Sequence, residues 1–290
     1  MSKIAILTDS SCDIPQEMAE KYGIDIMSFH ILLDDVDYIE RESCTNTEFY
    51  DKMRMAKGVP STAAITPIQF CEKYCQYVDE GYTDVIHVPI NKSGSSTYNN
   101  ALMAQGMLRE ERPEHHLKIH LLDPHTYSMV FGWYLCEMAR KLKNGAEITH
   151  VIQEFETQMN CMEIILGPYS LKQMKKSGRI SAAAAVMGEL MGVRPIITLI
   201  DGKTKVESKV RGDDKVVPAM VDLCQKRSAG VENFDYMIGH TNIKQAEDLE
   251  KACRKAFGKP PLVVFELGGV VSANTGPDTV ALVYTGHPRG

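Results

Sequence analysis

The densest group of side chains that could contact a ligand is the stretch NKSGSST at residues 91–97, which contains Ser93, Ser95, Ser96 and Thr97. It offers hydroxyl donors but no carboxylate and no histidine, so it lacks a group that could act as acid or base. The stretch follows an apolar run and leads into a helical pattern. Hydroxyls and spare N–H groups at a helix N-terminus suit a small anion such as a carboxylate or a phosphate. Such a loop would suit an anion, but a single loop of this composition is more often a turn or a helix cap that binds nothing.

Two more polar stretches have a similar setting, TDSSCD at residues 8–13 and PSTAAITP at residues 60–67. In a doubly wound sheet, ligands bind outside the carboxyl ends of the strands, where such loops gather. Each stretch alone is equally typical of turns and helix caps, because Ser, Thr and Asn favour both. Together they indicate one crevice with neutral donors. A fourth stretch, GGVVSANTGPDTVALVY at residues 268–284, adds a backbone bent by glycines and a proline.

The elements that would position these loops follow from the periodicity of the first half of the chain. Apolar runs predict strands at residues 3–9, 24–33, 84–90 and 118–123. Amphipathic stretches predict helices at residues 15–22, 45–57, 67–80, 96–109, 126–143 and 147–160. Strands that alternate with helices at this spacing form a parallel sheet with helices on both faces. We therefore expect an N-terminal parallel-sheet α/β domain over residues 1–160.

The second half of the chain has a different pattern. Its runs at residues 194–202 and 203–212 are joined so tightly that they must form a β-hairpin. Further strands are predicted at residues 163–167, 234–240, 262–268 and 279–286, and helices at residues 180–191, 213–228 and 242–257. Antiparallel pairing combined with helices predicts a C-terminal α+β domain with a mixed sheet over residues 161–290. The fold class is thus α/β with two domains.

Composition excludes several classes of function. A net charge of −6 and a pI of about 5.9 disfavour nucleic-acid binding, which needs a basic face. No apolar run reaches membrane-spanning length and the first strand is too short for a signal peptide, so we expect a soluble cytoplasmic protein without stable membrane insertion. Cys71 and Cys75 lie four residues apart on a predicted helix but lack the second pair of a zinc knuckle, and the histidines around residues 115–125 are split across strand faces. We expect no metal site.

Five motifs in order along nearly the whole chain resemble the DegV family. They are TDSSCDIP, TAAITPIQF, SSTYNNA, SGRISAAAAVMGELMGVRPIITLIDGK and ANTGPDTVALVY. The resemblance implies that one long-chain fatty acid is bound in a buried apolar tunnel between the two domains. It also implies that the chain is the acyl-carrying, non-catalytic subunit of a bacterial fatty-acid kinase, whose separate catalytic subunit phosphorylates the carboxylate. No catalytic residue and no cofactor besides the bound fatty acid are then expected.

The resemblance also implies which residues form the site. The expected contacts of the fatty-acid carboxylate are Thr62, Ser95, Ser96, Thr97, Asn274 and Thr275, with Ser10, Ser11, Ser93 and Gly276 as possible lining and Arg179 and Arg211 as contacts of the partner kinase. The chain departs from the family pattern at Ala63, Ser96, Asn274 and Asp278, where the family has serine, glycine, histidine and glycine. Asn274 can still donate a hydrogen bond to a carboxylate but carries no charge.

Two other functions stay open from the residues alone. The TDSS stretch could serve a hydrolase or phosphotransferase, with Asp9 as acid and Ser10 or Ser11 as nucleophile. Against this, the chain has no Walker A and no G-x-S-x-G motif, and no histidine is placed by sequence to activate either serine. The chain could instead be a ligand-sensing lipid-binding module that works without a kinase.

Overall fold

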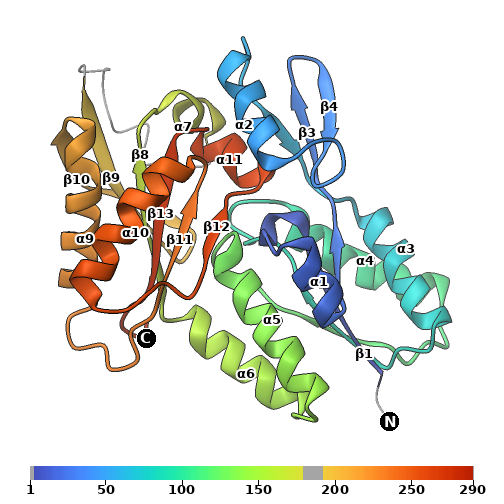
Figure 1. The fold of residues 1–290 in the computed structure, drawn as a ribbon. Coiled ribbons are helices and arrows are strands. Elements are labelled where there is room, and N and C mark those ends of the chain that lie inside the picture. The colour runs from blue at the N-terminus through green and yellow to red at the C-terminus, as the bar shows by residue number, and fades with distance from the viewer. Residues whose placement is uncertain (1–2, 179–191, 290) are drawn as a thin grey trace. The chain divides into compact units, whose positions relative to one another are not determined.

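The computed structural model describes residues 3–178 and 192–289. The chain divides into two compact units (Figure 1), the first made of Met1–His30 and Ala63–Glu156 and the second of Ile31–Thr62 and Thr157–Gly290. The junction after Glu156 lies close to the boundary expected at residue 160. The segment Ile31–Thr62, which the sequence analysis placed in the N-terminal domain, groups by its contacts with the second unit.

The first unit is built on a four-stranded sheet with the order β2-β1-β6-β7. Its strands are β1 (Ile4–Asp9), β2 (Ile24–Met27), β6 (Asp84–Val88) and β7 (Lys118–Leu121). Every pairing in this sheet is parallel. β1 is buried from Ala5 onward, as expected of an apolar central strand in a parallel sheet. The parallel-sheet fold class predicted for the N-terminal part is confirmed.

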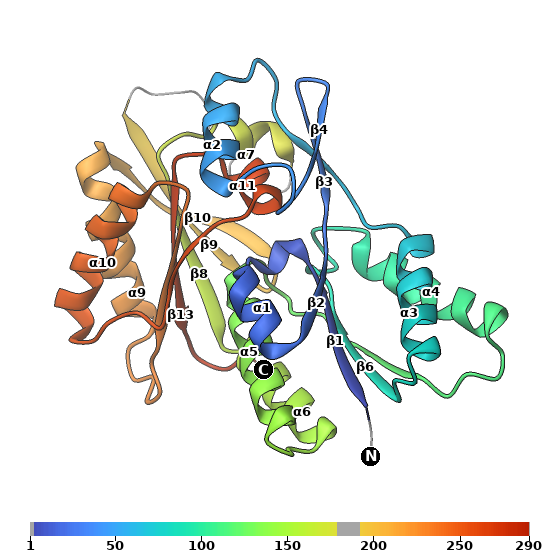
Figure 2. The same ribbon diagram turned by 45° about the vertical axis from the view of Figure 1, so that its right-hand side comes forward.

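Helices cover both faces of this sheet (Figure 2). On one face α1 (Gln16–Tyr22) packs beside α5 (Met129–Lys143), which is followed by α6 (Ile148–Met159); on the other face α3 (Pro67–Asp79) packs beside α4 (Thr97–Glu111). The chain leaves β1 toward one face and the adjacent β6 toward the other. The carboxyl ends of β1 and β6 therefore form the switch point at which α/β sheets bind ligands.

A buried histidine lies in the core of this unit. His87 on β6 is hydrogen-bonded through Nδ1 to the Tyr74 hydroxyl of α3 at 2.6 Å, and its ring meets the Phe70 ring edge-on with centroids 4.8 Å apart. Burial lowers the pKa of His87 from 6.5 to about 3, because the apolar surroundings disfavour the charged imidazolium. His87 is thus a neutral core residue at physiological pH.

The second unit contains a six-stranded sheet with the order β10-β9-β8-β13-β11-β12. The strands are β8 (Met162–Pro168), β9 (Val193–Ile200), β10 (Lys203–Arg211), β11 (Tyr236–His240), β12 (Val264–Glu266) and β13 (Thr279–Thr285). All pairings are antiparallel except that of β11 with β12. The mixed sheet and the β9–β10 hairpin predicted from the sequence are confirmed.

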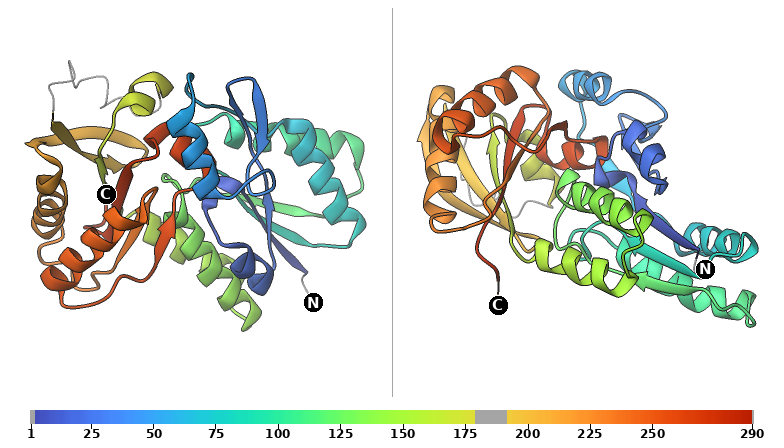
Figure 3. Two further views of the ribbon diagram at one scale, coloured as in Figure 1. Left: turned by 45° about the horizontal axis from the view of Figure 1, so that its top comes forward. Right: turned by 60° about the horizontal axis from the view of Figure 1, so that its bottom comes forward.

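Two helices cover one face of this sheet. α9 (Val216–Arg227), preceded by a short 3₁₀ turn at Asp213–Lys215, and α10 (Ile243–Phe257) lie side by side (Figures 1 and 3). Their apolar faces form a core with Ile165, Ile238 and Leu282 of the sheet. A β-carbon on Gly167 of β8 would lie 2.4 Å from the Met220 sulfur, so the close approach of α9 requires glycine there.

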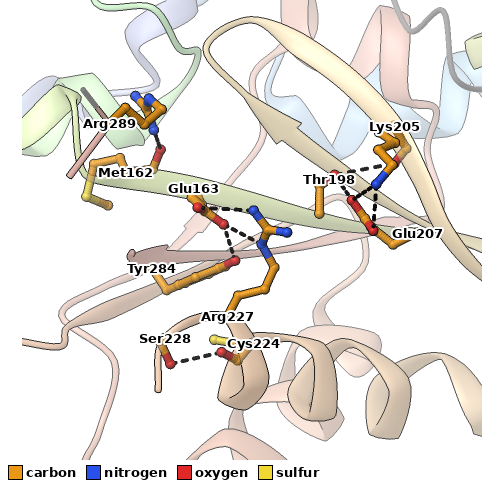
Figure 4. Close-up of polar contacts among 10 residues, drawn as sticks. All are labelled: Met162, Glu163, Thr198, Lys205, Glu207, Cys224, Arg227, Ser228, Tyr284 and Arg289. Atoms are coloured by element: carbon orange, nitrogen blue, oxygen red, sulfur yellow. Dashed lines mark hydrogen bonds and ion pairs between the residues drawn. The ribbon is translucent and has the colours of Figure 1, made fainter. Parts of the chain in front are cut away.

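A buried carboxylate fastens the end of the chain to this unit (Figure 4). Glu163 on β8 accepts hydrogen bonds from Arg227 Nε at 2.7 Å and from the Tyr284 hydroxyl at 2.5 Å. Beyond β13, Arg289 donates to the Met162 carbonyl at 2.9 Å. The ion pair with Arg227 fastens α9 to β8, and the hydrogen bonds from Tyr284 and Arg289 fasten β13 and the residues after it to β8.

The segment Ile31–Thr62 forms an additional layer of the second unit. Its strands β3 (His30–Leu33), β4 (Val36–Ile39) and β5 (Ser61–Ala63) form a small sheet in the order β4-β3-β5, and α2 (Asn46–Met55) lies between β4 and β5 in the chain. α2 packs against α11 (Gly269–Thr275), which also packs against α7 (Lys172–Ser177) (Figure 2). These contacts explain why the segment groups with the second unit.

Two element predictions were wrong. The single strand expected at residues 24–33 is broken into β2 and β3, which belong to different sheets. The break falls at Ser28 and Phe29, where the Phe29 N–H donates to Ser10 Oγ at 3.0 Å instead of entering a strand ladder. The 268–284 loop contains the short helix α11.

The helix predicted at residues 180–191 lies outside the described residues. Over the described residues, no helix is long and apolar enough to cross a membrane.

We predict that His87 makes stability depend on acid pH. The unfolded chain binds a proton on this histidine below about pH 6.5, whereas the folded chain does not until about pH 3, so the free energy of unfolding falls as pH drops across this window. The limiting slope is about 1.4 kcal/mol per pH unit. In urea titrations at pH 4 to 7, His87→Leu should reduce this slope by about that amount, while His116→Leu in an exposed loop should not. Equal slopes in both variants would contradict the assignment.

Candidate functional site

A buried carboxylate joins two loops at the switch point of the first unit. Asp9, the last residue of β1, accepts through Oδ1 from the Ser11 N–H at 3.1 Å and the Ser11 hydroxyl at 2.5 Å. Its Oδ2 accepts from the Ile90 N–H at 2.7 Å, directly after β6. A buried carboxylate requires such donors, since it has lost its hydration. Asp9 therefore braces the loops instead of standing ready as a catalytic acid.

The two serines of the first loop also serve the backbone. Ser10 and Ser11 are both buried, and they form a short 3₁₀ turn that ends at Cys12. Ser10 Oγ accepts from the Phe29 N–H at 3.0 Å, and the Ser11 carbonyl accepts from the Ser128 N–H at 2.9 Å. These bonds give both serines a structural role and fix the loop after β1.

The loop after β6 carries the predicted hydroxyls. Asn91 Oδ1 accepts from the Ser93 N–H at 2.8 Å and the Ser93 hydroxyl at 2.9 Å, which forms an Asx turn. Ser95 Oγ lies 2.8 Å from Thr97 Oγ1 and accepts from the Thr97 N–H at 3.2 Å. Ser95 is partly buried, Ser96 exposed and Thr97 buried. The structure thus brings these four hydroxyl residues into one short turn, as the sequence predicted.

The turn ends at the N-terminus of α4. Ser96 is the N-cap residue, and its side chain makes no capping hydrogen bond. The first turn of an α-helix leaves N–H groups without intrahelical acceptors, and its dipole favours negative charge. The Ser95–Thr97 hydroxyl pair and the first turn of α4 together form a neutral donor group suited to a carboxylate.

Two residues that the sequence analysis did not select shape this turn. Asn91 Nδ2 is buried, and among the described residues it has no acceptor. Gly94 lies against the Tyr127 ring, so that a β-carbon there would come within 2.2 Å of the phenol oxygen. The position of Asn91 directly behind a buried strand, two residues before a serine, is a signal that would have found it.

The stretch before α3 is held to the same unit. Thr66 caps α3 by accepting from the Gln69 N–H at 3.3 Å, with Pro67 as the first helical residue. Asn100 of α4 donates through Nδ2 to the Ile65 carbonyl at 2.7 Å. The TAAITP stretch is therefore tied to α4, the helix that follows the turn at residues 91–97. We call these residues the hydroxyl turn.

A second polar group belongs to the second unit, on α11. The Val270 N–H at its start donates to Glu40 Oε1 at 2.8 Å, and the Leu267 carbonyl accepts from the Tyr50 hydroxyl. At the other end, Arg54 donates to the Pro277 carbonyl at 2.7 Å. Three side chains from the Ile31–Thr62 segment thus fix α11 and its flanks, which explains how so short a helix is held.

The predicted residues of this second group differ in what their side chains do. Asn274 Nδ2 donates to the Val270 carbonyl one turn earlier at 2.8 Å, which leaves one further amide proton as a donor. Thr275 Oγ1 is buried and has no partner among the described residues. Gly276 follows with φ +92°, a conformation that favours glycine. Thr62, the remaining carboxylate candidate, lies partly exposed on β5.

Two further sets of residues considered from the sequence are the expected kinase contacts and the histidines around residues 115–125. Arg211 is exposed at the end of β10, the edge strand of the six-stranded sheet, and Arg179 lies outside the described residues. His120 pairs with Asp84 at 2.9 Å, and His125 lies 3.6 Å from Asp123. The carboxylate partners of these two histidines thus lie on different elements, Asp84 on β6 and Asp123 in the loop after β7.

The family model described as "Uncharacterised protein, DegV family" matches residues 3–286. The chain belongs to the DegV family. A DegV domain-containing protein of Clostridium perfringens is 29% identical over 98% of this chain and 99% of its own length. Among solved structures, a fatty acid binding DegV family protein from Streptococcus agalactiae is 26% identical, covers 100% of both chains and has a TM-score of 0.85. A stearic acid-binding protein from Eubacterium ventriosum, 21% identical over 98% of each chain with a TM-score of 0.89, shares the fold.

Two of the four positions at which the chain departs from the DegV family pattern can be described from their contacts. Ala63 ends β5 with an exposed side chain, so the missing hydroxyl removes one donor there without disturbing a buried contact. Asp278 accepts from Arg54 Nη2 at 3.1 Å, which uses its carboxylate to hold α2 against the residues after α11. Both departures leave the hydroxyl turn of this DegV protein intact.

We predict that Asp9→Asn loosens the hydroxyl turn. The amide can accept at only one oxygen and carries no charge, so at least one buried donor loses its partner, at a cost of about 1–3 kcal/mol. Hydrogen exchange followed by mass spectrometry should show faster exchange at the Ile90 amide. The exposed pair of Asp222 with Lys226 supplies the control, since Asp222→Asn should leave exchange near Ile90 and overall stability close to wild type. Unchanged protection at Ile90 in Asp9→Asn would contradict the bracing role.

Proposed function

We propose that this DegV family protein binds one long-chain fatty acid and holds its carboxylate on the hydroxyl turn at the start of α4. The observation that carries the proposal is the Ser95–Thr97 hydroxyl pair, 2.8 Å apart, at an α-helix whose N-cap side chain makes no capping bond. The fatty-acid binding named for the Streptococcus agalactiae protein, which is 26% identical over the full chain, supports the choice of ligand.

The chemistry of the turn favours a carboxylate over a reactive substrate. A carboxylate that leaves water requires several donors, and hydrogen bonds to a charged group are stronger than those between neutral groups. The turn provides hydroxyls and helix N–H groups, and Asn91 Nδ2 is a further buried donor that has no acceptor among the described residues. The nearest carboxylate on β1, that of Asp9, is committed to loop bracing. The protein would therefore hold the headgroup without transforming it.

The acyl chain would supply most of the affinity. Burial of each methylene gains about 0.8 kcal/mol, so a sixteen-carbon chain gains roughly 10 kcal/mol before the cost of association is subtracted. On the strength of the family resemblance, we propose Thr62, Asn274 and Thr275 as further carboxylate contacts, and the apolar tunnel as the place of the chain. Thr275 Oγ1, buried without a partner among the described residues, is the strongest of these three candidates.

We predict that Ser95→Ala combined with Thr97→Val weakens fatty-acid binding by at least about tenfold, because each lost hydrogen bond to a charged group is worth about 1.5–3 kcal/mol. Valine keeps the shape of buried Thr97. Delipidated protein titrated with palmitate by calorimetry measures the loss, and native mass spectrometry of gently purified wild type should show an adduct of fatty-acid mass.

The control for this test is Ser208→Ala, which removes an exposed hydroxyl on β10. It should bind palmitate like the wild type. The proposal fails if delipidated wild type takes up neither palmitate nor oleate. The placement of the carboxylate fails if the double variant binds as tightly as Ser208→Ala.

We further propose that the bound carboxylate is presented to the catalytic subunit of a fatty-acid kinase, with Arg179 and Arg211 as contacts of that partner. Arg211 is exposed on an edge strand that also carries exposed Lys203, Lys205 and Lys209, so this strand offers positive charge to a partner protein or to a transferring phosphate.

The kinase proposal predicts that Arg211→Ala and Arg179→Ala each reduce acyl-phosphate formation at least about tenfold while palmitate binding stays intact, since charge-assisted contacts to phosphate are strong and directional. Trapping the acyl phosphate with hydroxylamine, in the presence of the kinase subunit from the same genome, measures the product. Lys209→Ala on the same strand should retain activity. Loss of palmitate binding together with activity would instead make the arginine structural, and no acyl phosphate with wild type would favour a lipid-sensing module.

A further inference from the structure

Two cysteines and a glutamate meet where α3 and α4 pack together in the first unit. Cys71 and Cys75 lie one turn apart on the same face of α3, and Glu111 is the last residue of α4. The two sulfurs and a carboxylate oxygen all lie within 4.8 Å of one another, and Cys75 Sγ lies 3.6 Å from Glu111 Oε2. α3 and α4 lie side by side (Figure 3), so this contact connects the middle of α3 to the C-terminal end of α4.

These distances are close to those of a metal site. With Zn–S bonds of about 2.3 Å and Zn–O bonds of about 2.1 Å, a tetrahedron has S···O edges of about 3.6 Å and S···S edges of about 3.8 Å. The Cys75–Glu111 separation already equals such an edge, and the remaining pairs need to close by no more than about one ångström, within the range of side-chain rotation.

We propose that Cys71, Cys75 and Glu111 form a binding site for Zn²⁺, with a water molecule as the fourth ligand. Both cysteines are nearly inaccessible, at 1% and 8% exposure, whereas Glu111 is exposed. The cation would enter from the carboxylate side, where the fourth position faces solvent. Bound there, it would tie the middle of α3 to the end of α4. This site is independent of the fatty-acid proposal.

The state of the thiols selects the kind of cation. The thiolate form of cysteine is the metal ligand, so a bound cation must displace a proton from each of the two sulfurs to solvent. Hard cations such as Mg²⁺ and Ca²⁺ prefer oxygen ligands and do not compete for thiols, whereas Zn²⁺ forms stable thiolate bonds.

The charge of the site supports a divalent ion. Two thiolates and one carboxylate would repel one another, and the positive charge of neighbouring Arg112 lowers the cost only in part, since Arg112 also pairs with Asp79 at 3.7 Å. Zn²⁺ would neutralise most of this charge. The competing arrangement is a reduced pair in which the Cys75 thiol donates to Glu111, and the two arrangements differ in their response to added metal.

Cobalt(II) substitution tests the site in the full-length protein. Titration of the reduced protein with Co²⁺ should produce thiolate-to-metal charge-transfer absorption and the intense visible bands of a tetrahedral site, both removed by stoichiometric Zn²⁺. Cys71→Ser and Cys75→Ser should each lose charge-transfer intensity and bind Zn²⁺ at least about tenfold more weakly, since losing even an outer-shell partner costs about 10–100-fold. Glu111→Gln should weaken Zn²⁺ binding while keeping the charge-transfer band. Cys161→Ser, at a partly buried cysteine of the second unit, should behave like wild type.

A second measurement, the rate of cysteine alkylation, uses the wild-type protein alone. It therefore still tests the site if the cysteine variants do not fold. Equimolar Zn²⁺ should slow alkylation of Cys71 and Cys75 by iodoacetamide at least tenfold, measured by peptide mass spectrometry, while Cys161 in the same sample reacts at an unchanged rate. The proposal is overturned if Zn²⁺ fails to protect Cys71 and Cys75, or if Cys71→Ser and Cys75→Ser bind Zn²⁺ as tightly as Cys161→Ser.

Discussion

The candidate site depends on how one buried carboxylate is satisfied. Asp9 sits at the end of the central strand of a parallel sheet, where water is absent, so its oxygens must find donors within the fold. It takes them from its own loop and from Ile90 behind the neighbouring strand. This arrangement locks the two loops of the switch point to each other. The hydroxyl turn begins at Asn91, directly after Ile90, so the bond between the Ile90 N–H and Asp9 positions this turn.

In the second unit, the short helix α11 is held in place by side chains from a distant part of the chain. α11 has only seven residues, too few to be stable alone, and its start lacks a side-chain cap of its own. Glu40, Tyr50 and Arg54 provide its partners from a segment more than two hundred residues earlier in the chain. Gly269 permits the close approach, since a β-carbon there would meet Ile31 at 2.7 Å. The Ile31–Thr62 segment is therefore the brace of the second polar group.

Local patterns in the sequence predicted most of the fold. Apolar runs identified β1 and β6, an amphipathic stretch identified α3, and the tight join between residues 194–202 and 203–212 identified the β9–β10 hairpin. Features that depend on contacts between residues far apart in the sequence could not be predicted from local patterns. The break between β2 and β3 depends on a bond from Phe29 to Ser10, and α11 depends on Glu40; neither has a local sequence signature. The membership of Ile31–Thr62 in the second unit follows from those same distant contacts.

The sites show the same division. Ser93, Ser95, Ser96 and Thr97 lie in one loop, so their clustering could be predicted from their spacing. Asn91 was missed because an amide directly after a strand looks like an ordinary turn residue until its unmatched donor is seen. Cys71 and Cys75 were not predicted to bind a metal, because the sequence has no second cysteine pair and Glu111 lies on another helix. Only the packing of α3 against α4 brings that carboxylate to the sulfurs.

We propose that neutral donors at the start of α4 hold a carboxylate. Carbon-13 NMR of carboxyl-labelled palmitate bound to the protein reports on the surroundings of that carboxylate. We predict a single bound carboxyl resonance in slow exchange, shifted in the variant that combines Ser95→Ala with Thr97→Val and unshifted in Ser208→Ala. A bound resonance with the same chemical shift in all three proteins, or no bound resonance at all, would contradict the claim.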